Sequence, residues 1–103
     1  MNETKLKQTI QSEFENDEKF SVVILTVVLT VVEIFIFLYK NCNSAKGLIK
    51  KSARKKGFLY NKFLKNHVYP KLNDSNLSEE EKEIAIEKVR QLIIQDKLDE
   101  FIP

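Results

Sequence analysis

The sequence predicts an all-α protein: a single-pass transmembrane helix, then a basic and an acidic amphipathic helix that form a helical hairpin. Three observations predict this class. Residues 20–39 form an apolar run in which fifteen of twenty residues are Val, Ile, Leu or Phe. Charge is segregated after that run, with ten basic and no acidic residues in 40–71 and nine acidic against four basic residues in 72–103. Residues 78–95 combine a helix-capping sequence with helical spacing of apolar residues.

The first segment, residues 1–19, is short and net acidic, with five acidic and three basic residues. A cleaved signal peptide typically begins with a basic region and has a shorter apolar run than the one that follows here. We therefore interpret 1–19 as an acidic N-terminal segment ahead of a permanent membrane helix.

Residues 20–39 are predicted to cross a bilayer as one helix. Twenty helical residues extend over about 30 Å, which matches the thickness of the hydrocarbon core. Lys19 and Lys40 bracket the run, and Tyr39 occupies a position suited to an interfacial aromatic residue. A buried core helix is the alternative, but the short polar flanks are expected to provide too little chain to cover twenty apolar residues.

The orientation of this helix follows from the positions of basic residues. Five of them lie within fifteen residues after the run: Lys40, Lys46, Lys50, Lys51 and Arg54. Only three precede it. The positive-inside rule therefore predicts a cytoplasmic C-terminus, or its topological equivalent, and an N-terminus that is outside or lumenal.

One polar stripe interrupts the apolar helix. Thr26, Thr30 and Glu33 share a helical face, and the two threonines have the small-xxx-small spacing that lets a second helix approach closely. We interpret these three residues as a helix-packing surface within the membrane. Two alternatives remain open: a neutral and idle Glu33, or a self-associating pore in which Glu33 conducts protons or ions.

Residues 40–71 are predicted to be a basic amphipathic region beside the membrane, with Asn43 or Ser44 as its helix cap and Pro70 ending its helix. The expected contacts with anionic lipid headgroups are Lys46, Lys50, Lys51, Arg54, Lys55 and Lys56. The alternative is that these basic residues only set the topology of the span. The apolar stripe of this helix is expected to lie in the interface. Nucleic acid is a less favoured partner, because lysine predominates over arginine. Cys42 follows the span closely, at a position where reversible acylation is common, although the favoured interpretation is a buried or idle thiol.

Residues 72–103 contain the most sharply defined polar helix. Ser78 and Glu81 have the spacing of a capping box. One apolar face is expected to pack on the basic helix. A second face has no expected neighbour in the chain and is interpreted as a docking surface for a partner protein. Its members are Ile84, Ile94, Leu98 and Ile102.

The sequence contains no nucleophile–base pair, metal-ligand cluster or glycine-rich phosphate loop, so we expect no enzyme activity, no cofactor and no metal. His67 has no cysteine or second histidine near it, and we treat it as structural. The expected function is that of a small non-catalytic membrane subunit that acts as a scaffold or tether in a larger assembly. The alternatives are a virion protein that links an internal membrane to the capsid, a pore former, and a lipid- or nucleic-acid-binding anchor.

Overall fold

The computed structural model describes residues 3–18, 21–73 and 76–101, and this part of the chain forms helices and turns without any β-strand. The predicted all-α class is therefore confirmed. In chain order the elements are α1 (Glu3–Phe14), α2 (Val22–Asn41), α3 (Asn43–Arg54), α4 (Phe58–Phe63), the π-helical turn η1 (Leu64–Val68), α5 (Tyr69–Leu72), α6 (Glu79–Ile94) and the 3₁₀ turn η2 (Asp99–Phe101). Lys19, Phe20 and Ile102 lie outside the described residues.

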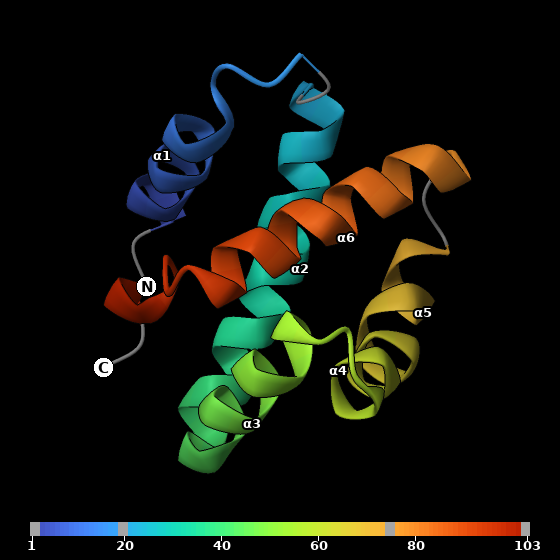
Figure 1. Ribbon diagram of the computed structural model, residues 1–103. Helices are drawn as coiled ribbons and strands as arrows, with labels where there is room; N and C mark the ends of the chain where they lie inside the picture. The colour runs from blue at the N-terminus through green and yellow to red at the C-terminus, as the bar shows by residue number, and fades with distance from the viewer. Residues whose placement is uncertain (1–2, 19–20, 74–75, 102–103) are drawn as a thin grey trace.

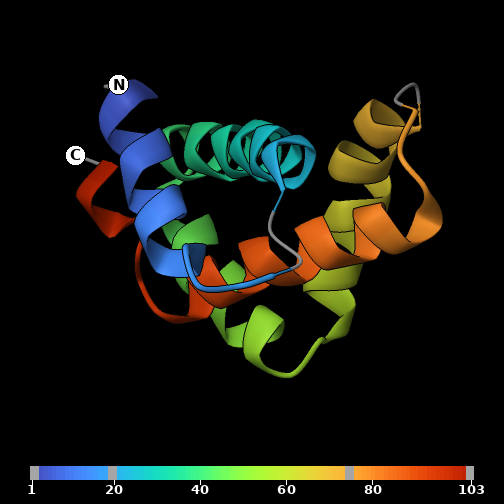
Figure 2. The same ribbon diagram turned by 90° about the horizontal axis from the view of Figure 1, so that it is seen from above.

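The helices gather around α2. Figure 1 shows α6 crossing in front of α2, with α1 on one side and the α4–α5 segment on the other. The view from above places α2 along one edge of the molecule, with α6 and α3 on its inner side (Figure 2). The Cα atoms extend over 34 × 27 × 23 Å. The apolar helix is thus packed against its own flanks over most of its length.

The inner side of α2 forms the centre of the core. Among the described residues, α2 is the one helix that is long and apolar enough to cross a membrane, judged by its length and composition. Nine of its side chains are nevertheless buried within the chain: Ile24, Leu25, Val27, Val28, Val31, Val32, Phe35, Ile36 and Tyr39. The expectation that the flanks are too short to cover this helix was therefore wrong for one of its sides.

The N-terminal segment contains a helix that the sequence analysis did not predict. α1 places Leu6 and Ile10, spaced by four residues, in the core with no exposed surface. Its polar side contacts the C-terminal part of the chain. Lys5 pairs with Glu100, Thr9 Oγ1 donates a hydrogen bond to the same carboxylate at 3.2 Å, and Glu13 pairs with Lys97.

The basic region is divided into α3 and a second helical segment that runs from α4 through η1 to α5. The helix continues past Pro70 to Leu72, which corrects the prediction that it ends before that proline. The wider π-helical turn of η1 comes directly before α5, and turns of this kind accommodate a break in regular i→i−4 bonding. α3 begins one residue earlier than expected, with Cys42 at its N-cap and no side-chain capping bond.

The apolar stripe of the basic region packs inside the molecule rather than along a membrane interface. Ile49, Ala53, Tyr60 and Leu64 are all buried. The Tyr60 ring stacks on Phe35 of α2 with centroids 6.1 Å apart. Burial raises the pKa of the Tyr60 phenol, whose hydroxyl group has no hydrogen-bond partner among the described residues. This stripe therefore serves the core.

The acidic helix α6 begins as the sequence predicts. Ser78 Oγ accepts a hydrogen bond from the Glu81 N–H at 3.1 Å, and the Glu81 carboxylate accepts one from the Ser78 N–H at 3.0 Å. α6 packs on both α2 and α3, so the neighbour expected to be missing from the chain is α2 itself. Ala85, Val89 and Leu92 form its fully buried positions.

Candidate functional site on the open face of α2 and the basic segment

One side of α2 is left uncovered by the rest of the described chain. Its exposed side chains between residues 22 and 38 are Val22, Val23, Thr26, Thr30 and Phe37, and its half-buried ones are Leu29, Glu33, Ile34 and Leu38. We call these nine residues the open face. Glu33 is the single charged residue between positions 20 and 39. A surface helix of a water-soluble domain normally carries charged and polar residues on its outward side. The open face is instead apolar apart from two threonines and one glutamate.

The predicted packing residues all lie on this face. Thr26 and Thr30 are exposed, and each hydroxyl donates a 3.0 Å hydrogen bond to a carbonyl oxygen one turn earlier in α2, that of Val22 and Thr26 respectively. Their hydroxyl donors are therefore satisfied within the helix, which leaves methyl groups and hydroxyl lone pairs at the surface. The pair presents small side chains at a spacing that permits close approach of another helix.

Glu33 lies beside a hollow of about 450 Å³ whose opposite wall comes from η1 and α5. That wall carries His67 and Lys71, while Thr30, Ile34 and Phe37 complete the lining from α2. His67 also packs against the ring of Phe63, with centroids 4.9 Å apart. The fold thus brings His67 and Lys71 to the side of α2 that carries Glu33. The sequence analysis did not anticipate this proximity.

The predicted lipid-contacting residues fall into two groups. Lys46 and Lys50 are half-buried and pair with carboxylates beyond α6: Lys46 Nζ is 3.1 Å from Asp99, and Lys50 Nζ is 2.6 Å from Asp96. The hydrogen bond from Lys50 lowers the pKa of the Asp96 carboxyl group. These two lysines therefore hold the C-terminal turn against α3.

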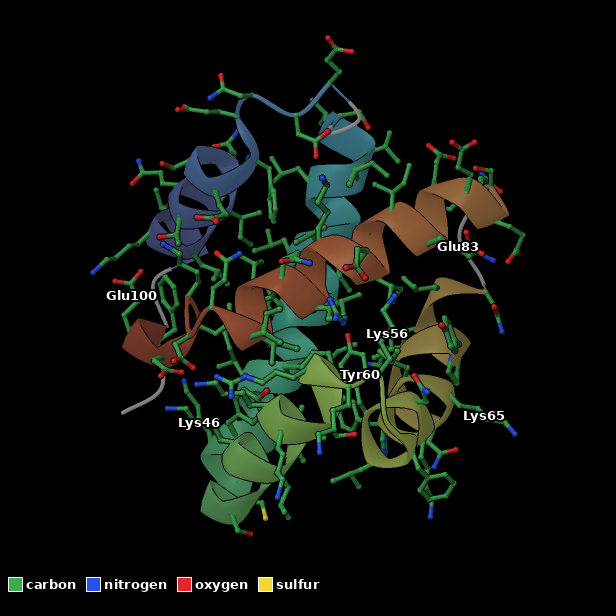
Figure 3. All side chains as sticks on the ribbon, in the orientation of Figure 1. Lys46, Lys56, Tyr60, Lys65, Glu83 and Glu100 are labelled. Carbon is green, nitrogen blue, oxygen red and sulfur yellow. The ribbon has the colours of Figure 1, made fainter. Side chains whose placement is uncertain are left out.

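The remaining four predicted contacts, Lys51, Arg54, Lys55 and Lys56, are exposed and make no ion pair with the described residues. Lys62 and Lys65 on the next helical segment are exposed as well. In Figure 3, Lys65 projects away from the body of the molecule. Lys46 lies on the opposite side, which is also the side of the C-terminal turn with Glu100. These exposed cations thus lie between the start of α3 and η1, and only some of them are distant from acidic residues, since Lys56 lines a hollow together with Glu79, Glu83 and Glu87 of α6.

Cys42 is exposed between α2 and α3. Its sulfur lies 3.4 Å from Ser44 Oγ, and this side-chain hydrogen bond, together with backbone donors, lowers the pKa of the thiol. The residue lines a second hollow of about 310 Å³ between the end of α2, α3 and α4. Leu48 and Leu59 line the same hollow and are 56% and 42% exposed. Leu48 belongs to the apolar stripe that was expected to lie in the interface, and unlike the buried members of that stripe it is exposed. Leu59 and the neighbouring Phe58, which is 81% exposed, are surface residues that the sequence analysis did not single out.

The predicted docking face of α6 is mostly covered by the chain itself. Leu98 is 2% exposed and belongs to the core, which corrects its interpretation as an accessible docking residue. Ile84 and Ile94 are half-buried and pack at the edge of the core. Ile102, the fourth predicted member, lies outside the described residues. The sequence could not reveal this, because the burial of these residues depends on segments far away in the chain; Ile84, for example, lines a hollow together with Phe14 of α1.

Within residues 3–18, 21–73 and 76–101, no group of three or more His, Cys, Asp or Glu side chains is placed to hold a metal ion. No protein-family model matches the chain, and no significant match is found among curated proteins or solved structures.

Proposed function

We propose that this chain is a small, non-catalytic membrane protein in which α2 is the membrane element, and that it acts as a scaffold or tether in a larger assembly. The main observation that supports this proposal is the open face of α2. Twenty residues of helix match the thickness of a bilayer core, and the outward side has a single charged group. A helix that is apolar on all sides is typical of a membrane span or of the core of a large protein, and this chain is small.

The scaffold role is supported by the chemistry of the open face. Thr26 and Thr30 form a shallow, small-residue surface between larger apolar side chains, which is the kind of surface that packs against another transmembrane helix. Glu33 adds a carboxyl group that could hydrogen-bond to such a helix. A partner helix seated there would cover the part of α2 that the chain leaves open.

Crossing the membrane has a definite structural consequence. With the N-terminus on one side and the C-terminus on the other, about 30 Å of hydrocarbon would separate α1 from α6 and η2. In the compact fold these elements are in contact, through Lys5–Glu100, Glu13–Lys97 and Asp17–Lys88. The compact and spanning arrangements therefore exclude each other in one molecule. A spanning α2 requires that α1 leaves the C-terminal segment and that α6 and the Tyr60 ring leave the inner side of α2.

The test measures this separation directly by cross-linking. In a Cys42→Ser background, Thr9→Cys and Glu100→Cys place thiols on two residues that touch in the compact fold. The matched pair Lys50→Cys and Asp96→Cys joins two positions that both follow α2 and stay on the same side in either arrangement. In sealed vesicles, a short bis-maleimide should join the second pair and not the first. Equal cross-linking of both pairs in carbonate-resistant membranes would rule out the spanning topology.

The scaffold role has its own test. Thr26→Leu with Thr30→Leu fills the small-residue surface while keeping α2 apolar, so membrane retention should persist and co-purifying membrane proteins should be lost. Ser12→Leu, an exposed position on α1, serves as the control and should retain those proteins. The scaffold proposal fails if the double variant keeps every partner at wild-type yield.

A further inference from the structure

The second hollow, between the end of α2, α3 and α4, has a lining that differs from the rest of the surface. Its walls are formed by Leu38, Leu48, Ile49, Leu59 and Phe63. Its polar lining residues include Lys62 and His67, and none of the lining residues is acidic. An aliphatic hollow with a few polar groups is the common form of a site for a small apolar ligand.

The surroundings of this hollow are both apolar and basic. Phe58 lies next to Leu59 at the start of α4 and is 81% exposed, with Lys62 Nζ 5.9 Å from the centre of its ring. On α3, Lys51 lies one turn beyond Leu48 on the same face, so its charge stands close to an exposed leucine. Long lysine side chains next to exposed apolar residues can keep their stems on the apolar surface while the ammonium groups remain in water.

The distribution of charge identifies the chemistry of a partner. Residues 34–73 contain no Asp or Glu, and the two carboxylates that pair with α3, Asp96 and Asp99, are held by Lys50 and Lys46. The lysine in its lining, Lys62, and Lys51, one turn beyond Leu48, make no ion pair with the described residues. A ligand with an anionic head and an apolar tail would complement both halves of this surface.

We propose that this hollow, which we call the α3–α4 groove, binds an acyl chain of an anionic membrane lipid, with Lys51 and Lys62 beside its headgroup. The inference rests on the proposal that the protein works at a membrane, but it does not require that α2 crosses the membrane. Leu48 and Leu59 form the walls that contact the chain. Phe58 enters the interfacial layer beside it, as exposed aromatic residues of amphipathic membrane-surface helices do.

The absence of tryptophan from the sequence gives this proposal a specific probe. Phe58→Trp in the full-length protein places a single indole at the mouth of the groove with little change in shape. The protein is kept in a mild nonionic detergent, so that the solvation of α2 is the same throughout. Lipids with brominated acyl chains, which quench indole fluorescence on contact, are then added: phosphatidylglycerol and, with the same chains, phosphatidylcholine.

We expect phosphatidylglycerol to quench the indole at concentrations about tenfold lower than phosphatidylcholine. Adding Lys62→Gln should weaken the binding of the anionic lipid about fivefold, the effect expected for one basic residue at an anionic surface. Leu59→Asn should weaken the binding of both lipids. Lys7→Gln, which removes an exposed charge from α1, should change neither curve, and a reporter at Gln8→Trp should remain unquenched.

Three results would overturn the proposal. Equal quenching by the two lipids would show that the positive charges do not select the headgroup. Displacement of the lipid by inorganic phosphate alone would indicate an anion site without a role for the acyl chain. Displacement by a single-stranded oligonucleotide at lower concentration would assign the surface to nucleic acid. Because the solvation of α2 is held constant, each of these results leaves the cross-linking test of the spanning topology unaffected.

Discussion

Arg90 of α6 donates a hydrogen bond from Nε to the backbone carbonyl oxygen of Ala53, 2.9 Å away near the end of α3. The same guanidinium group contacts the Glu87 carboxylate at 3.0 Å through Nη1. The Ala53 carbonyl oxygen, in the last turn of α3, also accepts a 3.2 Å hydrogen bond from the Lys56 N–H. A carbonyl oxygen has two lone pairs, so Arg90 adds a charged donor from another helix to a group that is already bonded within its own turn. This contact links the basic and acidic halves of the chain at a half-buried position.

The first prediction concerns this contact. Arg90→Met keeps most of the apolar stem and removes the donors, and we expect it to lower the free energy of unfolding by about 1.5–3 kcal/mol, the range for hydrogen bonds to charged groups. Arg54→Met replaces the chain's other arginine, which is exposed, and should change the value by no more than about 0.5 kcal/mol. Urea unfolding followed by helical circular dichroism measures both. Equal effects would contradict a specific role for Arg90.

The second prediction concerns what holds α1 in place. The ion pairs of α1 are at least partly exposed, and such pairs are typically worth about 0–1 kcal/mol. Leu6→Ala and Ile10→Ala each remove a fully buried side chain. We expect each substitution to weaken the free energy with which α1 docks on the core by about 2–5 kcal/mol. Hydrogen exchange of the α1 amides should therefore accelerate strongly in these variants. Glu100→Gln should accelerate it only slightly, and a larger effect from Glu100→Gln would refute this ranking.

The third prediction uses two helix ends with unusual backbone conformations. Lys56 has φ 50° and Asp96 has φ 59°. In both cases the next residue donates to the carbonyl oxygen five positions earlier, Gly57 to Ser52 and Lys97 to Leu92, which is a Schellman motif without its usual glycine. Side chains other than glycine adopt this left-handed region at a cost.

We therefore expect Lys56→Gly to raise the free energy of unfolding by about 0.5–1 kcal/mol, even though it removes a charge and adds a glycine. Lys55→Gly is the matched control, because Lys55 has φ −100° and gains no such relief. It should lower the stability. Thermal unfolding of the two variants under one buffer condition decides the matter, and a loss of stability in both would contradict the role of the left-handed conformation.

The fourth prediction concerns pH. The hydrogen bond from Lys50 lowers the pKa of Asp96 in the folded protein, so this carboxylate contributes stability above its pKa in the unfolded chain. The contribution should be lost as pH falls through the lower pKa of the folded state. The difference in melting temperature between wild type and Asp96→Asn should therefore be present at pH 7 and shrink in acid. A difference that stays constant from pH 7 to pH 3 would contradict this account.

Local patterns in the sequence determined the features that depend on neighbouring residues. The capping box of Ser78 and Glu81, the helical apolar run up to Tyr39 and the all-α class follow from spacing within one or two helical turns. The helix in 3–14 had a comparable signal, since Leu6, Ile10 and Phe14 recur every fourth residue, but the prediction considered only the charge of the longer segment 1–19. The end predicted at Pro70 failed because a π-helical turn precedes this proline.

Only the tertiary structure decided which sides of these helices are covered. Leu98 and the stripe of Ile49, Ala53 and Tyr60 are apolar in the sequence whether they face a membrane, a partner or the chain itself. Their burial depends on contacts with α2 and α6, which are distant in sequence. The same holds for Lys46 and Lys50, whose acidic partners lie more than forty residues later. Periodicity fixes the apolar side of a helix, but the element that packs on it is selected by the arrangement of the whole chain.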